Sequence, residues 1–278
     1  MEQDQQQSHD NLFVELIQKA TEKELDDAAR QFNFPVPGQG AKSDVLFNSI
    51  GVFTSKGIED TTVQDLLDAA NISRRTFYKY FKNKVEVLES IYQIAAELLM
   101  ARFRAVKKQS ASLSEFVVQC VELFFDYHAN LGPLIRMMTE EALRADSPLA
   151  PHRATLLEHM VNLFDDRYFE EEGVRLDPKV YYSLIWMMES ASMNILTTTP
   201  CTREVVDSYK ADMCSISARA MVSDPSQWDS LPRLPTRQFE PRAANAHSLE
   251  PFGHRVDAAP GPHGAPTRFN NEAPAGGI

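Results

Sequence analysis

Residues 73–84 contain the densest group of positive charges in the chain and no carboxylate. The five cations are Arg74, Arg75, Lys79, Lys82 and Lys84. Arginine can donate two hydrogen bonds to one guanine in the DNA major groove, and tyrosine and lysine side chains suit phosphate oxygens. We therefore interpret this segment as a nucleic-acid contact. The alternative is a solvated basic face on an ordinary helix.

The aromatic residues of the same segment indicate how it would be held. Phe77 and Phe81 lie four residues apart, so a helix places both on one face, which can pack inward. Arg75, Tyr78 and Lys79 then face elsewhere. An apolar anchor combined with a basic face favours the nucleic-acid interpretation over the solvated one.

The charge of the whole chain, −11 at pH 7, argues at first against an anionic partner. Residues 42–84, however, carry seven Lys and Arg against five Asp and Glu, a net charge of +2, and the regions on either side are negative. Phosphate binding needs a local patch of positive charge, so the net charge of the chain is a poor guide to its partner.

Two short helices are predicted before the basic segment. Apolar residues at helical spacing predict the first over residues 45–53, and Gly57 can end it because glycine adopts positive φ at little cost. The second is predicted over residues 63–67. Either Thr61 or Thr62 can cap it by accepting a hydrogen bond from its first turn.

A tight turn connects the second helix to the basic one. Asn71 stands in this turn, and asparagine often replaces glycine where φ must be positive. Ser73 can cap the third helix, which is predicted over residues 74–81. Two helices of about two turns each, joined by a short turn, have helix-turn-helix spacing.

These residues resemble the N-terminal domain of TetR (tetracycline-repressor) type regulators, without a gap from Val45 to Lys84. The resemblance rests on three runs: Phe53-Thr54-Ser55-Lys56-Gly57, Thr61-Thr62-Val63-Gln64-Asp65-Leu66, and Ala70-Asn71-Ile72-Ser73-Arg74-Arg75-Thr76-Phe77-Tyr78-Lys79-Tyr80-Phe81-Lys82-Asn83-Lys84. Asn71 stands where glycine is usual, Arg75 where a small residue is common, and Tyr80 where histidine is frequent. The last two departures leave the base sequence open but not the mode of binding.

The resemblance implies a function. Regulators of this type are homodimers that bind a palindromic operator in double-stranded DNA, commonly as repressors, and a small apolar effector releases them. By the same resemblance, ten residues are expected at or near DNA: Thr62, Gln64, Ser73, Arg74, Arg75, Thr76, Tyr78, Lys79, Tyr80 and Lys84. We expect Arg75 to read a base and Lys84, at the start of the next helix, to bind a phosphate.

The remaining sequence predicts an all-α protein with a helical bundle after the helix-turn-helix domain, and the resemblance implies that this bundle serves ligand binding and dimerisation. After a long helix over residues 83–107, the periodicity predicts helices over residues 112–130, 133–145, 148–171, 178–198 and 202–222. We divide the chain into four parts. An N-terminal extension (residues 1–41) precedes the helix-turn-helix domain (residues 42–84). A ligand-binding and dimerisation domain (residues 85–223) and a Pro- and Gly-rich tail (residues 224–278) follow.

Both ends of the chain lie outside the TetR resemblance. The N-terminal extension contains one amphipathic helix, predicted over residues 11–32, which is either an accessory helix packed on the next domain or an arm for a partner or DNA. The tail has no apolar periodicity and is expected to be disordered or loosely draped.

The helix predicted over residues 178–198 is apolar on nearly every face, which is typical of a helix buried on all sides. In the family, the last two long helices form the dimer interface. We expect the interface to include Met193, Ile195, Val205, Tyr209, Met213 and Ile216. The alternative is that this seam belongs to the core of a single chain.

A flexible apolar effector pocket is implied by the resemblance and suits the Met and aromatic content of the bundle. The candidates that could line it are Phe116, Phe124, Tyr127, His128, Met160, Phe164, Trp186 and Ser190. Each of them can equally well fill the core.

Other classes of function find little support in the sequence. It contains no glycine-rich phosphate loop, paired-carboxylate motif or Cys/His arrangement, so we expect neither an enzyme nor a cofactor. His152 and His159 share a helix face without a third ligand, and we predict no metal site. Three cysteines without a CxxC pair, no secretory signal and no spanning segment favour a cytoplasmic protein whose cysteines are buried. An effector-independent DNA-binding or interaction protein of the same fold stays the alternative.

Overall fold

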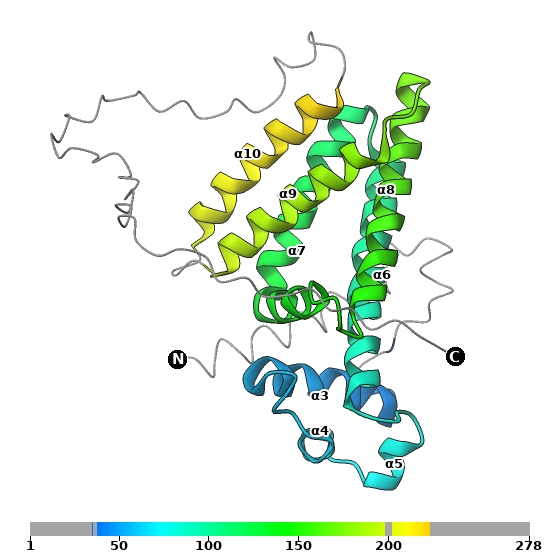
Figure 1. The fold of residues 1–278 in the computed structure, drawn as a ribbon, viewed down its shortest axis with the longest axis vertical. Helices are drawn as coiled ribbons and strands as arrows, with labels where there is room; N and C mark the ends of the chain where they lie inside the picture. Colours follow the sequence, from blue (N-terminus) through cyan, green and yellow to red (C-terminus); the bar gives the residue numbers. More distant parts are fainter. Residues whose placement is uncertain (1–34, 36–37, 198–201, 223–278) are drawn as a thin grey trace, which may run out of the picture. The chain divides into compact units, whose positions relative to one another are not determined.

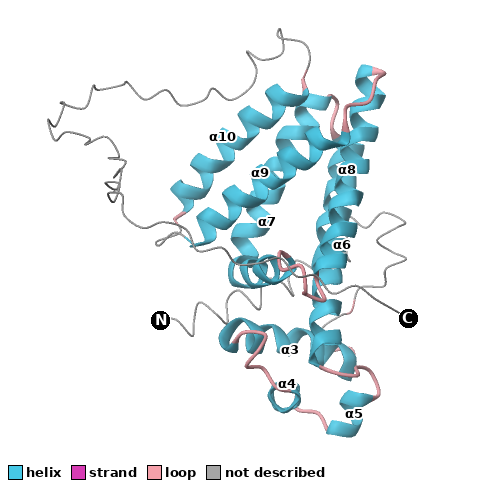
Figure 2. Ribbon diagram, in the orientation of Figure 1, coloured by secondary structure: helices cyan, strands magenta, loops and turns pink. Residues whose placement is uncertain are grey.

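The computed structural model describes residue 35, residues 38–197 and residues 202–222, which belong to one compact unit. These residues form helices and no strands, so the predicted all-α class is confirmed (Figure 2). The predicted helix over residues 11–32 and the predicted disordered tail lie outside the described residues. Among the described helices, none has the length and apolar character needed to cross a membrane.

Three helices form the N-terminal domain: α3 (Ala41–Lys56), α4 (Val63–Ala70) and α5 (Arg74–Tyr78) (Figure 1). Gly57 follows α3 with a φ of 80°, and its N–H donates to the carbonyl of Phe53, as expected for a helix stop. The third helix is shorter than predicted. Beyond Tyr78 the chain continues as a turn in which the amides of Tyr80 and Phe81 both donate to the carbonyl of Phe77.

Five longer helices follow: α6 (Lys84–Gln109), α7 (Leu113–Ala142), α8 (Ala150–Glu172), α9 (Pro178–Thr197) and α10 (Arg203–Met221). Figure 1 shows α6 extending from the N-terminal domain into the bundle. Three of the starts are set by local side chains, because Asn83, Ser112 and Thr202 each accept a hydrogen bond from the amide three residues on. Cys120 and Cys214 are buried as predicted, whereas Cys201 lies outside the described residues.

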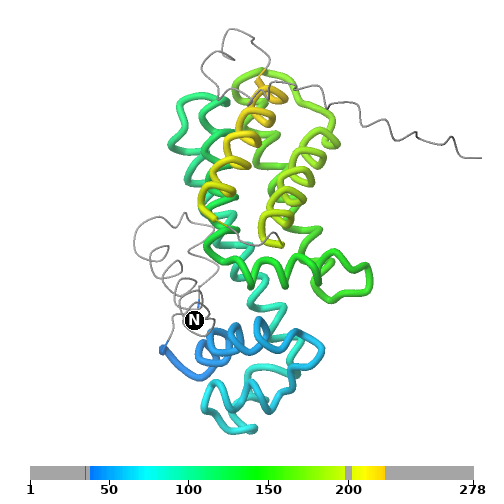
Figure 3. The backbone as a smooth tube through the Cα atoms, turned by 90° about the vertical axis from the view of Figure 1, so that its left-hand side faces the viewer, coloured from blue at the N-terminus to red at the C-terminus, as the bar shows by residue number. Residues whose placement is uncertain are grey.

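The prediction of two helices over residues 112–130 and 133–145 is wrong, because α7 continues through Gly132 and Pro133. Proline removes one backbone hydrogen bond and usually bends a helix without always ending it. Leu131 and Leu134, on either side of the pair, are 1% and 4% exposed, so packing on both sides holds the helix together. Figure 3 shows the part of α7 after the proline running across the bundle.

Candidate DNA interface and internal cavity

The basic helix α5 is fixed to the N-terminal domain by its aromatic residues. Phe77 and Phe81 are 0% and 2% exposed, and their ring centroids lie 5.7 Å apart. Both belong to the same core as Phe53 of α3 and Leu66 of α4, each of which is fully buried. The predicted inward anchor is therefore confirmed. Because these two rings fix α5 to the core, the opposite, basic face of α5 is held in a defined orientation toward solvent.

The turn before α5 has the predicted chemistry. Asn71 adopts the left-handed conformation with φ 50° and ψ 47°, and the Ser73 hydroxyl accepts a hydrogen bond from the amide of Thr76 at 3.1 Å. Of the two candidate caps for α4, Thr62 is the one used. Its hydroxyl accepts from the amide of Asp65, whose carboxylate accepts in return from the amide of Thr62.

Most residues expected at DNA lie on the exposed side of α4 and α5. Tyr78 is 50% exposed, which is unusual for an aromatic residue beside a core. Thr76 and Tyr80 are half-buried, and the Lys79 ammonium lies 5.3 Å from the centre of the Tyr80 ring. The exposed residues of this set are Thr62, Gln64, Ser73, Arg74, Arg75, Tyr78 and Lys79. This surface can meet phosphate and base edges without rearrangement of the core.

The two arginines of α5 differ in their partners. The Arg74 guanidinium donates to Oε1 of Gln64 at 3.1 Å, and Nε2 of Gln64 donates to Oδ1 of Asp68 at 2.8 Å. This chain links α5 to α4 across the exposed surface and orients Arg74. Arg75 has no hydrogen bond or ion pair with any described residue, so its donors are available to an external acceptor.

Lys84 lies at the start of α6, as predicted, but it makes contacts within the chain that the sequence did not indicate. Its ammonium donates to the carbonyls of Ile58, Glu59 and Thr61 at 2.8, 2.7 and 2.6 Å. An ammonium has three donors, so these bonds occupy all of them and leave none for a phosphate in this conformation. The first residue of α6 therefore holds the α3–α4 loop. The sequence contained no signal for this, because the partners lie 23 to 26 residues away.

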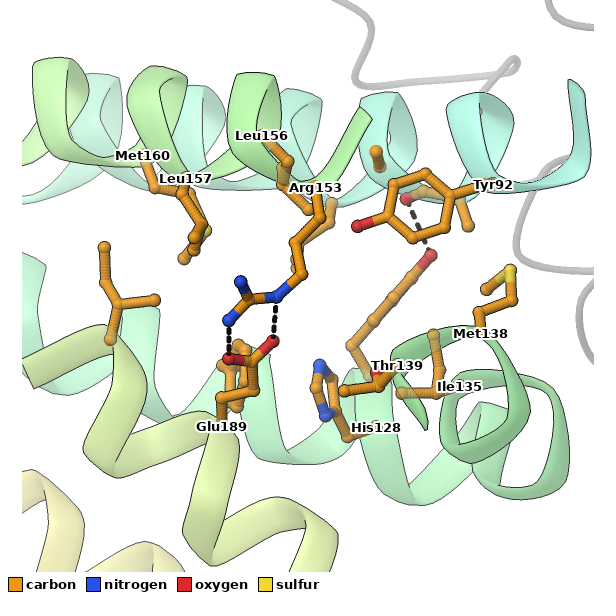
Figure 4. A pocket seen from close by; sticks show the side chains of 16 residues that line it. Tyr92, His128, Ile135, Met138, Thr139, Arg153, Leu156, Leu157, Met160 and Glu189 are labelled. Atoms are coloured by element: carbon orange, nitrogen blue, oxygen red, sulfur yellow. Dashed lines mark hydrogen bonds and ion pairs between the residues drawn. The ribbon is translucent and has the colours of Figure 1, made fainter. Parts of the chain in front are cut away.

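A cavity of about 60 Å³ lies inside the bundle between α6, α7, α8 and α9 (Figure 4). Four of the residues predicted to line an effector pocket are brought together there: Phe124, Tyr127, His128 and Met160. Most of the other walls are apolar, from Leu99, Ile135, Met138, Leu156, Leu157 and Ile185.

The other four predicted lining residues lie elsewhere. Phe116 is fully buried in the core, and Phe164 lines a second cavity of about 10 Å³. Trp186 is 53% exposed, and Ser190 is also exposed. Both follow directly after residues that line the cavity, and one step along a helix turns a side chain by about 100°. Bulk and polarity in the sequence did not reveal which face of α9 turns inward.

The sequence analysis also missed the charged residues of the cavity. Arg153 of α8 and Glu189 of α9 form a two-pronged ion pair at its wall, with Nε to Oε1 at 3.0 Å and a second bond from Nη2 to Oε2 (Figure 4). The hydrogen bond from Arg153 to Glu189 raises the pKa of the guanidinium, so the positive charge of Arg153 is retained at the cavity wall. The partners lie 36 residues apart, so no local pattern connects them.

The polar groups of the Tyr127 and His128 rings are less available to a ligand, because each already has a partner within the chain. The Tyr127 hydroxyl donates to the carbonyl of Ala95 at 2.8 Å. His128 Nδ1 lies 2.6 Å from the Ser192 hydroxyl, and burial lowers the pKa of this histidine to about 3. His128 is therefore uncharged at neutral pH. A larger, open groove of about 800 Å³ between α6, α7 and α10 has several charged lining residues, among them Arg102, Glu122 and Asp126. This is less suited to an apolar molecule.

The residues predicted for a dimer interface on α9 and α10 are partly exposed in the single chain, with one exception. Met193, Val205, Tyr209, Met213 and Ile216 are half-buried within the single chain. Ile195 is 3% exposed and belongs to the intrachain core. The face of α10 that packs inside the chain carries Val206, Cys214, Ala218 and Met221. Val205, Tyr209 and Met213 also pack against the edge of the intrachain core, so the predicted seam is only partly available to a second chain, and its role as an interface stays a prediction.

Known proteins resemble this arrangement in sequence over the N-terminal domain and in fold over most of the described residues. Residues 49–91 match the family model of bacterial regulatory proteins, tetR family. The fatty acid degradation regulator FadR of Bacillus halodurans superposes with a TM-score of 0.56 at 19% identity, over 64% of this chain and 94% of that one. The TetR-family regulator SCO4454 of Streptomyces coelicolor superposes with a TM-score of 0.54 at 14% identity, over 65% of this chain and 89% of that one. No curated protein matches the chain.

Proposed function

We propose, from the tetR-family match of residues 49–91 and the TetR-type fold, that the chain is a homodimeric, sequence-specific DNA-binding regulator. The observation that carries the proposal is the basic, exposed face of α5 on a buried aromatic anchor, Phe77 and Phe81. We propose further that it acts in the cytoplasm as a repressor, and that a small molecule releases it from its operator.

The geometry of α4 and α5 supports docking in the major groove. The start of α5 carries Arg74 and Arg75 on its exposed side, where a recognition helix meets base edges. Tyr78 and Lys79 lie further along the same helix and suit phosphate oxygens, as do Thr62 and Gln64 of α4. In a symmetric dimer, two copies of α5 would enter successive major grooves about 34–36 Å apart, which requires a palindromic operator.

The internal cavity supports release by an effector. Its α6 wall begins at Tyr92, eight residues after Lys84, which holds the α3–α4 loop. A cavity of about 60 Å³ is far smaller than an ordinary ligand site of about 300–1,000 Å³, so an effector has to push the helices apart. Movement of α6 would change the separation of the two α5 helices, and both could then no longer dock together.

A second link joins the bundle to the N-terminal domain. The Arg144 guanidinium, just after α7, lies 3.3 Å from the Glu59 carboxylate in the α3–α4 loop. Thr139 of α7, one turn earlier, lines the cavity. Both groups of the ion pair are well exposed, so its contribution to stability is small. It nevertheless places the end of α7 against the loop that Lys84 also holds.

Footprinting on the DNA that flanks the chain's own gene tests the proposal. We expect protection of two half-sites in a palindrome, separated by about one helical turn, and loss of protection when an effector is added. Protection that no cavity ligand removes would favour an effector-independent DNA-binding protein of the same fold, which the small volume of the cavity also allows. The absence of any sequence-selective footprint would contradict the regulator function.

Charged substitutions at the outward faces of α9 and α10 test the proposed dimer. Replacing Met193 and Ile216 together by glutamate is expected to give monomers in analytical ultracentrifugation, because an interface that buries unpaired carboxylates pays a large desolvation cost. Both side chains are only half-buried in the single chain, so the fold is expected to survive. Ala154→Glu, at an exposed site on α8, is the matched control and should stay dimeric. A dimeric double variant would place the interface elsewhere.

A further inference from the structure

The charged side chains that line the internal cavity are a matched pair. Arg153 and Glu189 line the same wall, and each side chain is 17% exposed. Their two-pronged contact uses Nε and Nη2 of the guanidinium and both carboxylate oxygens. His128 is the other titratable nitrogen at the cavity, and its low pKa of about 3 leaves it uncharged. The wall therefore has a net charge of zero.

Several hydrogen-bonding groups at this end of the cavity have no partner among the described residues. They are the Nη1 group of Arg153 and the hydroxyls of Tyr92 and Thr139. Figure 4 shows the Tyr92 hydroxyl on the side of the cavity where the Arg153 guanidinium lies. By contrast, the Tyr127 hydroxyl and His128 Nδ1 already have partners. Nη1 of Arg153 can only donate, and each of the two hydroxyls can donate as well as accept, so together they suit an oxygen that accepts hydrogen bonds.

We propose that the cavity binds an uncharged, largely apolar molecule with one hydrogen-bond-accepting oxygen, such as an alcohol, ketone or ester, held near Arg153 and Tyr92. This inference rests on the proposed function, in which the same cavity is the effector site. The apolar part of the ligand would lie against Leu99, Ile135, Leu157 and Ile185.

The ion pair itself excludes charged ligands. A carboxylate that took the place of Glu189 on Arg153 would leave the Glu189 carboxylate buried without a counter-charge. An ammonium paired with Glu189 would likewise leave the Arg153 guanidinium without a counter-charge. Removal of one partner from a buried ion pair is strongly unfavourable, whereas a neutral oxygen can accept from Nη1 and leave the pair intact.

The flexible residues of the cavity can make room for such a ligand. Met138 of α7 and Met160 of α8 line it, and methionine side chains change shape more readily than branched ones. An engineered apolar cavity of about 150 Å³ is known to hold benzene, so the present volume of about 60 Å³ must grow for an alkyl chain.

Isothermal titration calorimetry of the full chain with three probes that have the same number of carbon atoms tests the ligand class. The probes are n-decanol, decanoate and n-decylammonium at neutral pH. We expect n-decanol to bind at least about tenfold more tightly than either ion, because only the ions require an unpaired buried charge. Tighter binding of decanoate or n-decylammonium would overturn the proposed ligand class. Failure of all three to bind would also overturn the inference.

Two variants separate the charge argument from simple shape. Glu189→Gln keeps a hydrogen-bond acceptor for Arg153 but leaves one positive charge, so we expect the preference to move to decanoate. Arg153→Met with Glu189→Leu makes the wall neutral and apolar, and we expect decanoate to be excluded again. If Glu189→Gln fails to fold, as judged by circular dichroism, the double variant and the natural chain still give the ranking. Preference for n-decanol in a folded Glu189→Gln variant would contradict the role of the ion pair.

A parallel measurement of operator affinity keeps the ligand class distinct from the proposed regulation. n-Decanol that binds the chain but leaves its affinity for operator DNA unchanged would contradict release by an effector and leave the ligand class standing. If decanoate bound more tightly than n-decanol and released the operator, the proposed ligand class would be contradicted and release by an effector would be supported.

Discussion

Arg75→Ala is expected to weaken binding to the operator while binding to random DNA stays nearly unchanged. Arg75 is the second residue of α5, is exposed and makes no hydrogen bond or ion pair with a described residue. Its loss therefore removes no contact that holds the fold. A lost arginine–guanine contact costs about 1–3 kcal/mol, and a dimer makes it twice. Titration of cognate and scrambled duplexes at fixed salt measures the difference.

Arg136→Ala provides a matched control for this variant. Arg136 lies on α7, pairs with Glu140 in an exposed contact of 2.9 Å, and is remote in sequence from the helix-turn-helix. Its removal makes the same change of charge and should leave both affinities nearly unchanged. If Arg75→Ala weakens binding to cognate and scrambled DNA alike, Arg75 contacts phosphate and the base is read by another residue.

Lys84→Met is expected to lower both the stability of the N-terminal domain and the affinity for every DNA sequence. Methionine keeps the aliphatic stem but cannot donate to the carbonyls of Ile58, Glu59 and Thr61. A single hydrogen bond from a charged group contributes about 1.5–3 kcal/mol. We expect the loss of all three bonds of Lys84 to lower the free energy of unfolding by about 3 kcal/mol. Thermal unfolding and DNA titration at several salt concentrations measure both effects.

The salt dependence distinguishes this role from a phosphate contact. Loss of a phosphate contact reduces the slope of log K against log salt by about 0.9 for each subunit, whereas loss of a loop contact leaves the slope unchanged. Lys108→Met is the control, because the Lys108 side chain, near the opposite end of α6, is exposed and makes no hydrogen bond or ion pair with a described residue, so neither the slope nor the stability should change. A reduced slope with unchanged stability for Lys84→Met would restore the phosphate contact inferred from the sequence.

The sequence alone was sufficient for the helix-turn-helix. Thr62, one of the two candidate caps, and Ser73 accept from the amides that their positions predicted, and Asn71 has the positive φ expected of it. Each of these features depends on atoms within about three residues along the chain, and the spacing of Phe77 and Phe81 depends on one turn of helix. Local geometry is encoded locally, so type and spacing were enough.

The continuous helix α7 required the tertiary structure. Gly132 and Pro133 are strong local signals for a break, and the prediction followed them. Residues on both sides are buried against other helices, and the free energy of that packing exceeds the cost of one lost backbone hydrogen bond. The preference of Gly132 and Pro133 for a break is still visible as a change of direction along α7. The part of α7 after this change carries Thr139, which lines the cavity.

The sequence by itself determined the fold class, the helix-turn-helix and which face of α5 is basic. Only the tertiary structure decided that Lys84 holds a loop, that Trp186 and Ser190 face away from the cavity, and that Arg153 meets Glu189. Those features depend on which helix packs beside which, and that is set by long-range burial of many weak apolar contacts. No single residue pattern carries that information, because the same amphipathic helix can turn toward a neighbour, a cavity or a second chain.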